Sequence, residues 1–152
     1  MRKLWFLTLA GALLLGLGCQ KDVVPQEEVD RDLILEYLSD NGLTATEHPS
    51  GLFYNIEAPG GSEKPALSNE VRVRYKGMLR DGYVFDQTTG TETRNFLLQS
   101  LIQGWRIGIP LLGRGGKGKF YVPSALGYGS QSLPGIPGNS VLVFEIELVD
   151  FQ

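Results

Sequence analysis

The C-terminal stretch VLVFEIELVDF, residues 141–151, constrains the fold more than any other part of the sequence. In an extended strand every second side chain points to the same side, and this stretch has that period. The apolar residues that share one side are Leu142, Phe144, Ile146 and Leu148. On the other side, Glu145 and Glu147 mark the wetter face. The stretch therefore predicts a long strand with one face turned to a hydrophobic core.

Two other segments predict further strands. VRVRY (71–75) alternates apolar and basic residues, and KFYV (119–122) is a second candidate. Asp81-Gly82 stands between the first of these and YVFD (83–86), which is a strong signal for a hairpin turn. The 20 Gly and 8 Pro in 152 residues favour turns between strands over a helical bundle. Together these features predict several antiparallel strands with one face to cover.

The segment LIQGWR, residues 101–106, is expected to supply that cover as a short helix. Ser100, with Gln103 three positions later, forms a capping-box pattern for the helix start, and Gly108 is expected to end it. Gly104 costs about 1 kcal/mol of helix propensity relative to Ala, so we expect another group to approach the backbone closely there. The side chains expected to face the sheet are Leu101, Ile102 and Trp105.

A second helix is predicted near the N-terminus, over residues 27–42. Its apolar residues recur with a helical period and are Val29, Leu33, Ile34, Tyr37 and Leu38. Asn41-Gly42 supplies the stop signal. The acidic residues of QEEVDRD (26–32), Asp30 among them, are expected to form a solvated first turn that the helix dipole favours. We expect the apolar face to pack on the chain's own domain, with a dimer interface as the alternative.

The first 18 residues are predicted to be a signal peptide rather than part of the fold. Arg2 and Lys3 precede a mostly apolar run that is shorter than the ~20 residues of a membrane-spanning helix. Cys19, the one cysteine, follows LGLG in a pattern that resembles the lipobox of bacterial lipoproteins, so we expect it to be lipidated. A plain signal peptide without lipidation is the alternative. Residues 19–26 are then a polar tether.

Several classes of function find no support in the composition. The net charge is −3 and no basic stripe is present, so we expect no nucleic-acid binding. GRGGKGK (113–119) lacks the ending of a phosphate-binding loop and is expected to be a flexible turn. The one histidine, His48, does not make a metal site by itself. We therefore expect no metal and no cofactor.

Four separated segments resemble the FKBP-type peptidyl-prolyl cis–trans isomerases, and in particular a bacterial lipoprotein member of that family. They are YKGMLRDGYVFDQT (75–88), LIQGWRIGIPLL (101–112), VPSALGYG (122–129) and VLVFEIELVD (141–150), in the family's order. The resemblance covers about residues 50–150 and implies an isomerase domain over 43–152. It implies an α+β fold in which a twisted antiparallel sheet of five to six strands wraps around one short helix. The N-terminal helix predicted over residues 27–42 is an addition to this fold.

The resemblance also implies an apolar pocket between sheet and helix. Carried over position by position, its residues are Tyr75, Phe85, Asp86, Phe96, Leu101, Ile102, Trp105, Tyr128 and Phe144. Trp105 would form the floor, while the Ile102 N–H and the Tyr128 hydroxyl would bind substrate carbonyls. Asp86 would lie at the edge and tune polarity. Leu133 and Ile136, in the loop 130–139, would lie at the rim. Without the resemblance, these aromatic residues would be interpreted as core.

The implied activity is isomerisation of X–Pro bonds in exported proteins as they fold. The alternative is a non-catalytic chaperone module of the cell envelope that binds proline-containing segments. The expected partners are proline-containing polypeptides, and the expected inhibitors are macrolides such as tacrolimus or rapamycin. We expect a monomer that is anchored to an envelope membrane by the lipid on Cys19.

Overall fold

The computed structural model describes residues 23–152. The predicted signal peptide, Cys19 and the first part of the tether lie outside these residues. In chain order, with η for a 3-10 turn, the elements are α1 (Gln26–Asp40), β1 (Thr46–Glu47), β2 (Phe53–Ala58), β3 (Glu70–Leu79), β4 (Val84–Gln87), β5 (Arg94–Leu97), η1 (Leu98–Ser100), α2 (Gln103–Gly108), η2 (Ile109–Leu111), β6 (Gly116–Val122), η3 (Ser124–Leu126) and β7 (Leu142–Phe151).

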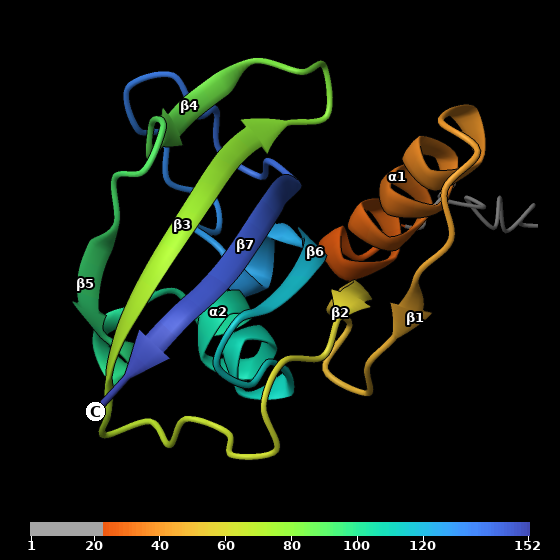
Figure 1. Ribbon diagram of the computed structural model, residues 1–152. Coiled ribbons are helices and arrows are strands. Elements are labelled where there is room, and N and C mark those ends of the chain that lie inside the picture. The colour runs from red at the N-terminus through yellow and green to blue at the C-terminus, as the bar shows by residue number, and fades with distance from the viewer. Residues whose placement is uncertain (1–22) are drawn as a thin grey trace, which may run out of the picture.

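The strands form one antiparallel sheet in the order β1-β2-β6-β7-β3-β4, and β5 also pairs with β3 (Figure 1). The two ten-residue strands β3 and β7 lie side by side at its centre. The predicted fold class is confirmed, although the sheet has seven strands because the two-residue β1 extends its edge. The predicted hairpin turn joins β3 to β4, and Gly82 adopts a φ of 88° there.

Two of the predicted strands are longer in the structure than in the sequence pattern. The segment 71–75 is part of β3, and 119–122 is part of β6. The prediction that 113–119 forms a flexible turn is partly wrong, because β6 already begins at Gly116. Lys117 pairs there with Glu147 of β7. Alternating glycine and lysine lacks the apolar signal of a strand, and pairing with both neighbours supplies the order.

The helix α2 lies against one face of the sheet and fills its curve (Figure 1). Trp105 and Ile109 pack there with residues from β3, β6 and β7, Phe120 and Leu148 among them, in the main hydrophobic core. The alternation of β7 places the predicted apolar set on this face, and all four of those side chains are buried. The core therefore holds α2 in place through the residues that define the sheet's inner face.

The predicted capping box at the start of α2 is wrong. Ser100 belongs to the preceding turn η1, and its hydroxyl donates to the carbonyl of Leu97 at 2.7 Å. The N-cap is Ile102, whose carbonyl accepts from the N–H groups of Trp105 and Arg106 at 3.0 and 3.1 Å. The 3-10 turn and the extended Leu101 shift the helix start by two residues, so no side chain caps α2.

The close approach expected at Gly104 is present, and its partner is Val122 of β6. A Cβ built on Gly104 would lie 2.6 Å from Cγ1 of Val122, far inside van der Waals contact. A glycine at this position lets the helix backbone rest directly on the strand. The helix therefore sits closer to the sheet than any larger residue would allow.

The helix α1 covers part of the opposite face, beside the β1–β2–β6 side of the sheet (Figure 1). Ile34 and Leu38 are buried there against Phe53, Tyr121 and Val143, in a second and smaller core. The prediction that the apolar face of α1 packs on the chain's own domain is thus confirmed. Both faces of the first part of β7 are buried in consequence, and the wetter face begins at Glu145.

The prediction of a fully solvated first turn in α1 is wrong at Asp30. This residue is 1% exposed, although Glu27, Glu28 and Asp32 around it are exposed as expected. An acid inside a helix turn has no sequence signature of burial. Its burial depends on a hydrogen bond to a distant segment, which is described below.

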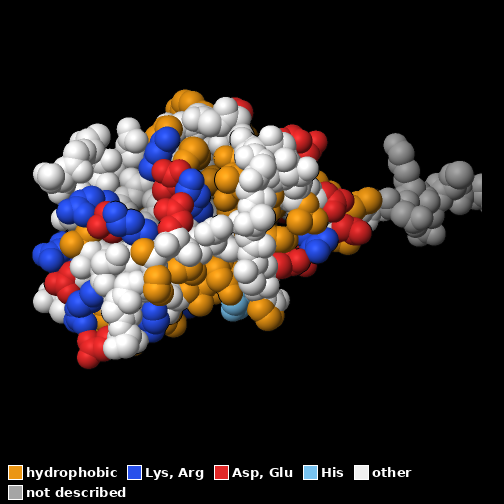
Figure 2. Space-filling model, turned by 45° about the vertical axis from the view of Figure 1, so that its right-hand side comes forward, with side chains coloured by type: hydrophobic (Ala, Val, Ile, Leu, Met, Phe, Trp, Pro, Cys, Tyr) orange, Lys and Arg blue, Asp and Glu red, His pale blue; other side chains and the backbone are white. Residues whose placement is uncertain are grey.

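Past the part covered by α1, the outer face of the sheet carries cross-strand ion pairs. Glu147 lies 3.1 Å from Arg74 and 3.5 Å from Lys117, and Lys119 lies 3.3 Å from Glu145. Figure 2 shows acidic and basic side chains mixed over this part of the surface. Such exposed pairs each contribute between about 0 and 1 kcal/mol. Within residues 23–152, no helix has the length and apolar character needed to cross a bilayer.

Candidate active site

A cleft of about 130 Å³ lies between α2 and the strands β3, β4, β5 and β7. A cavity needs about 10–15 Å³ to hold one water molecule. The cleft has about ten times that volume and can therefore accept a group the size of a five-membered ring. The residues that line it are the nine that the sequence resemblance indicates: Tyr75, Phe85, Asp86, Phe96, Leu101, Ile102, Trp105, Tyr128 and Phe144. Segments separated by up to about half the chain thus meet at one place.

The indole of Trp105 forms the inner wall of the cleft and is 5% exposed. Three rings meet it edge to face, those of Tyr75, Phe144 and Phe96, with centroids 5.1, 5.3 and 5.9 Å from its own. This geometry suits the quadrupoles of the rings and is typical of stable aromatic clusters. The Nε1–H of Trp105 is buried and finds no acceptor among residues 23–152.

A second ring pair lines the cleft beside Trp105 and packs over a glycine. Phe85 of β4 meets Phe144 of β7 at 5.7 Å with an interplanar angle of 85°. Both rings lie against Gly77 of β3, where an added Cβ would be 2.7 Å from Phe85 and 2.8 Å from Phe144. The absent side chain at Gly77 therefore gives these rings their place on the wall.

The rim of the cleft carries a polar cluster of Tyr75, Asp86 and Arg94. The Tyr75 hydroxyl donates to a carboxylate oxygen of Asp86. Arg94 of β5 donates to that hydroxyl at 2.7 Å and to the two oxygens of Asp86 at 3.0 and 3.1 Å. The guanidinium also lies 5.6 Å from the centroid of the Tyr75 ring. Arg94 was not predicted from the sequence, although it shares a face of β5 with Phe96, two residues on.

These contacts fix the charges of the rim. Burial raises the pKa of the Asp86 carboxyl, but the hydrogen bonds from Tyr75 and Arg94 outweigh it and hold the pKa below its ordinary value. Burial and the neighbouring carboxylate raise the pKa of the Tyr75 hydroxyl well above its ordinary value. Near neutral pH the rim is therefore an ionised acid between a protonated phenol and a guanidinium.

Two residues that line the cleft carry hydrogen-bond donors without a partner in the described part of the chain. The N–H of Ile102 precedes α2 and donates to no backbone or side-chain acceptor of residues 23–152. The hydroxyl of Tyr128 makes no hydrogen bond there either. Burial, and to a smaller extent the charge of Asp86, raises the pKa of this hydroxyl, so it stays protonated. Both groups are available to a carbonyl in the cleft.

Leu133 and Ile136 are not among the residues that line the cleft. They pair with each other across a tight turn, with N–O distances of 2.8 and 2.9 Å in the two directions. The side chain of Leu133 is 39% exposed, and that of Ile136 is 6% exposed and belongs to the main core. Their assignment to the substrate rim stays a prediction.

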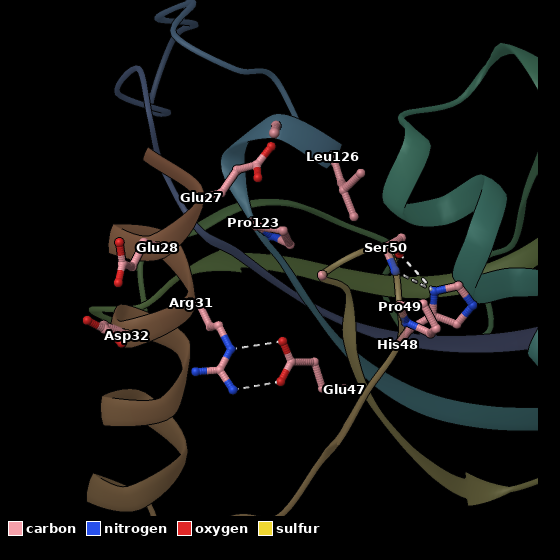
Figure 3. Close-up of a pocket in the computed structure, with 12 residues that line it drawn as sticks. Glu27, Glu28, Arg31, Asp32, Glu47, His48, Pro49, Ser50, Pro123 and Leu126 are labelled. Atoms are coloured by element: carbon pink, nitrogen blue, oxygen red, sulfur yellow. Dashed lines mark hydrogen bonds and ion pairs between the residues drawn. The ribbon is translucent and has the colours of Figure 1, made fainter. Parts of the chain in front are cut away.

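A larger hollow of about 630 Å³ lies elsewhere, between the start of α1, the β1–β2 turn and η3. Figure 3 shows Arg31 paired there with Glu47 through two hydrogen bonds of 2.9 Å, with His48 beside Ser50. No aromatic ring other than the imidazole of His48 is among the residues that line it. Within residues 23–152, no group of three acidic, His or Cys side chains could hold a metal ion. We place the candidate site in the aromatic cleft because the unpaired donors and the ring cluster meet there.

Comparison with known proteins agrees with the fold. The family model for FKBP-type peptidyl-prolyl cis-trans isomerases matches residues 61–149. The isomerase FkpA of Aeromonas hydrophila is 38% identical over 133 residues, which are 87% of this chain and 49% of that protein. The chain belongs to the FKBP-type peptidyl-prolyl cis-trans isomerase family.

Two solved structures are similar to this one. The crystal structure of FkpA from Escherichia coli superposes with a TM-score of 0.74 at 37% identity, over 84% of this chain and 59% of that one. A peptidyl-prolyl cis-trans isomerase from Pseudomonas syringae gives 0.70 at 30% identity, over 86% of this chain and 98% of that one. This chain spans about half the length of the curated FkpA relatives it matches.

Proposed function

We propose that this protein catalyses cis–trans isomerisation of X–Pro bonds in polypeptides. The observation that carries the proposal is the aromatic cleft above Trp105, whose nine lining residues include two unpaired hydrogen-bond donors. Membership of the isomerase family supports it. The proposed substrate is an extended segment whose proline ring enters the cleft.

The reaction needs no bond to break. Resonance between nitrogen and carbonyl gives a barrier of ~18–20 kcal/mol to rotation of a peptide bond. For X–Pro the two isomers differ by about 0.5–1 kcal/mol and exchange in tens to hundreds of seconds. A catalyst must therefore favour the twisted state, in which the resonance is lost and the nitrogen becomes pyramidal.

A dry ring-lined cleft meets that requirement. The planar amide is charge-separated and well hydrated, so removal of water disfavours it relative to the less polar twisted state. The rings of Trp105, Phe85 and Phe144 would enclose the proline on one side of the bond. The Ile102 N–H and the Tyr128 hydroxyl would hold the flanking carbonyls while the other side turns.

Asp86 has a different proposed role. Its carboxylate is ionised, with a lowered pKa, and is held by Tyr75 and Arg94. A group fixed in this way is a permanent negative charge at the cleft's edge rather than a proton donor. We propose that it disfavours the negative end of the planar amide dipole and that it holds the Tyr75 ring in place.

A protease-coupled assay on an Ala-Leu-Pro-Phe peptide tests the proposal, with tacrolimus as the control. We expect faster cis-to-trans conversion that tacrolimus or rapamycin abolishes. Binding of the peptide without any acceleration at micromolar protein would support the alternative, a non-catalytic proline-peptide-binding chaperone module. The fluorescence of Trp105 should respond to the macrolide in a chain that begins at Cys19, because Trp5 is then absent.

We further propose that the isomerase works in a bacterial cell envelope. In this proposal residues 1–18 are removed, Cys19 is lipidated, residues 19–26 form the tether, and the helix 27–42 and the domain 43–152 stand off the membrane as a monomer. The sequence pattern before Cys19 supports it. Expression in a bacterium should give a membrane-bound form with a lipid mass on Cys19, and C19S should release the protein. Size-exclusion chromatography of the released form tests the monomer.

A further inference from the structure

Asp30 is a buried carboxylate with a single long-range partner. Among residues 23–152, the buried polar or charged side chains are those of Asp30, 1% exposed, and Ser124, 2% exposed. One oxygen of Asp30 accepts from the Gln26 amide at 2.7 Å within α1. The other accepts from the backbone N–H of Ser124 at 2.7 Å, across 94 positions of sequence. The buried acid of α1 thus makes its long-range hydrogen bond to the turn η3.

The turn η3 has no cap of its own. Its first N–H groups lack intrahelical acceptors, as at every helix start, and its N-cap residue is Pro123, which makes no side-chain cap. The carboxylate of Asp30 fills that place from another element. The position of η3 is therefore set from α1.

The same turn holds both neighbours of Tyr128. The carbonyl of Ser124 accepts from the N–H of Gly127 at 2.9 Å and from that of Gly129 at 2.8 Å. Tyr128 stands between these two glycines, and its ring lines the cleft. The N–H and the carbonyl of Ser124 stand on either side of one α-carbon, so the hydrogen bond from this N–H to Asp30 fixes the residue whose carbonyl accepts from both glycines. A continuous path runs from Asp30 through Ser124 to the backbone on either side of Tyr128.

We propose that Asp30 is a positioning residue for the isomerase reaction and that α1 sets the orientation of Tyr128 through it. This inference rests on the proposed function. Figure 3 shows the two elements that the bond joins, with Glu27 of α1 and with Pro123 and Leu126 at η3 around one hollow. The N-terminal helix is then a working part of the catalytic unit rather than a spacer.

The test compares D30A with D30N and with the control I34A. Ile34 lies one turn further along α1, is 0% exposed, and packs in the second core without a bond to η3. We expect D30A to lower kcat/KM by about three- to tenfold and D30N to lower it less, since the Asn oxygen can still accept from Ser124. I34A should destabilise the fold and leave kcat/KM of the folded fraction unchanged. Equal losses in D30A and I34A, or a loss in neither, would overturn the proposal.

A double-mutant cycle with Y128F identifies the route. If Asp30 acts through Tyr128, D30A should change kcat/KM by less than about twofold in the Y128F background. Effects that simply multiply would refute this path. Backbone amide NMR gives a readout independent of activity, because D30N should shift Ser124, Gly127 and Gly129 whereas I34A should not. An inactive wild-type protein would reject the proposed function, while the amide shifts would still decide whether the connection exists.

Discussion

The indole of Trp105 lies edge-on to the ring of Tyr75, with centroids 5.1 Å apart and planes at 81°. Through this contact the innermost residue of the cleft touches the polar rim, because the Tyr75 hydroxyl is bonded to Asp86 and Arg94. Trp105 also belongs to the main core. Packing and chemistry therefore depend on the same side chain, and the two cannot be varied separately at this position.

W105A should lower both stability and activity. Removal of a buried tryptophan costs about 3–5 kcal/mol in the free energy of unfolding, and the cleft loses its floor. W105F should keep much of both, because it retains a ring and removes an N–H that has no acceptor among residues 23–152. Urea unfolding and the peptide assay measure the two effects. A stable W105A protein with full activity would contradict the assigned place of Trp105.

G104A should destabilise the protein even though alanine is the better helix former. The gain in propensity is about 1 kcal/mol, and overpacking against Val122 costs about 1–3 kcal/mol. In the V122A background the penalty should shrink or change sign, since the clashing methyl groups are gone. Q103A, at the exposed neighbouring position, is the control and should be near neutral. If G104A were more stable than the wild type, Val122 would move aside at no cost in free energy, and the expected overpacking would be absent.

Y128F should reduce activity modestly. It removes one hydrogen bond to the substrate, worth about 0.5–1.5 kcal/mol, which corresponds to about a two- to twelvefold loss in kcat/KM. The ring stays in the cleft, so the stability of the fold should change little. Steady-state kinetics and urea unfolding of the variant test both statements. Abolished turnover in an intact fold would mean that the hydroxyl does more than hold the chain.

Asp86 should make stability depend on pH in the acid range. Its pKa is lower in the folded protein than its ordinary value of 3.8, so the unfolded chain binds the proton first. The stabilisation is present above that value and is lost as the pH falls through the folded pKa. The stability gap between wild type and D86N should therefore close below about pH 4.

Urea unfolding between neutral and strongly acid pH measures this gap. D40N is the control, because Asp40 is exposed at the end of α1 and is in no ion pair within residues 23–152. The difference in the free energy of unfolding between D40N and the wild type should not change between neutral and strongly acid pH. A D86N gap that is constant or widens on acidification would contradict the arrangement of the rim.

The strands β3, β4, β6 and β7 followed from the sequence because an alternation of side chains, a run of strand-forming residues or a hairpin signal marks each of them, whereas β1, β2 and β5 were not predicted. The alternation of β7 placed Phe144 on the inner face before any partner was known, and the hairpin signal placed β4 beside β3. The start of α2 was wrong because the pattern at Ser100 fits a capping box, yet a 3-10 turn takes that residue out of the helix. A local motif cannot report which of two turns a residue joins.

The residues of the cleft were found by resemblance, whereas Arg94 and Asp30 were missed. Arg94 reaches the rim through a long side chain, and its alternation with Phe96 on β5 was the available signal. Asp30 had no signal, because an acid in the first turns of a helix is ordinary and its partner is a backbone N–H far along the chain. Almost every residue has a backbone N–H, so a hydrogen bond to one leaves no pattern in the sequence.

The most direct test of the account is the exchange rate between the cis and trans forms of an Ala-Leu-Pro-Phe peptide, measured by NMR exchange spectroscopy with a small fraction of protein. We expect exchange cross-peaks that are absent without protein, that tacrolimus removes and that W105A largely loses. Peptide binding with an exchange rate equal to that in buffer would contradict the claim that this cleft lowers the barrier to prolyl rotation.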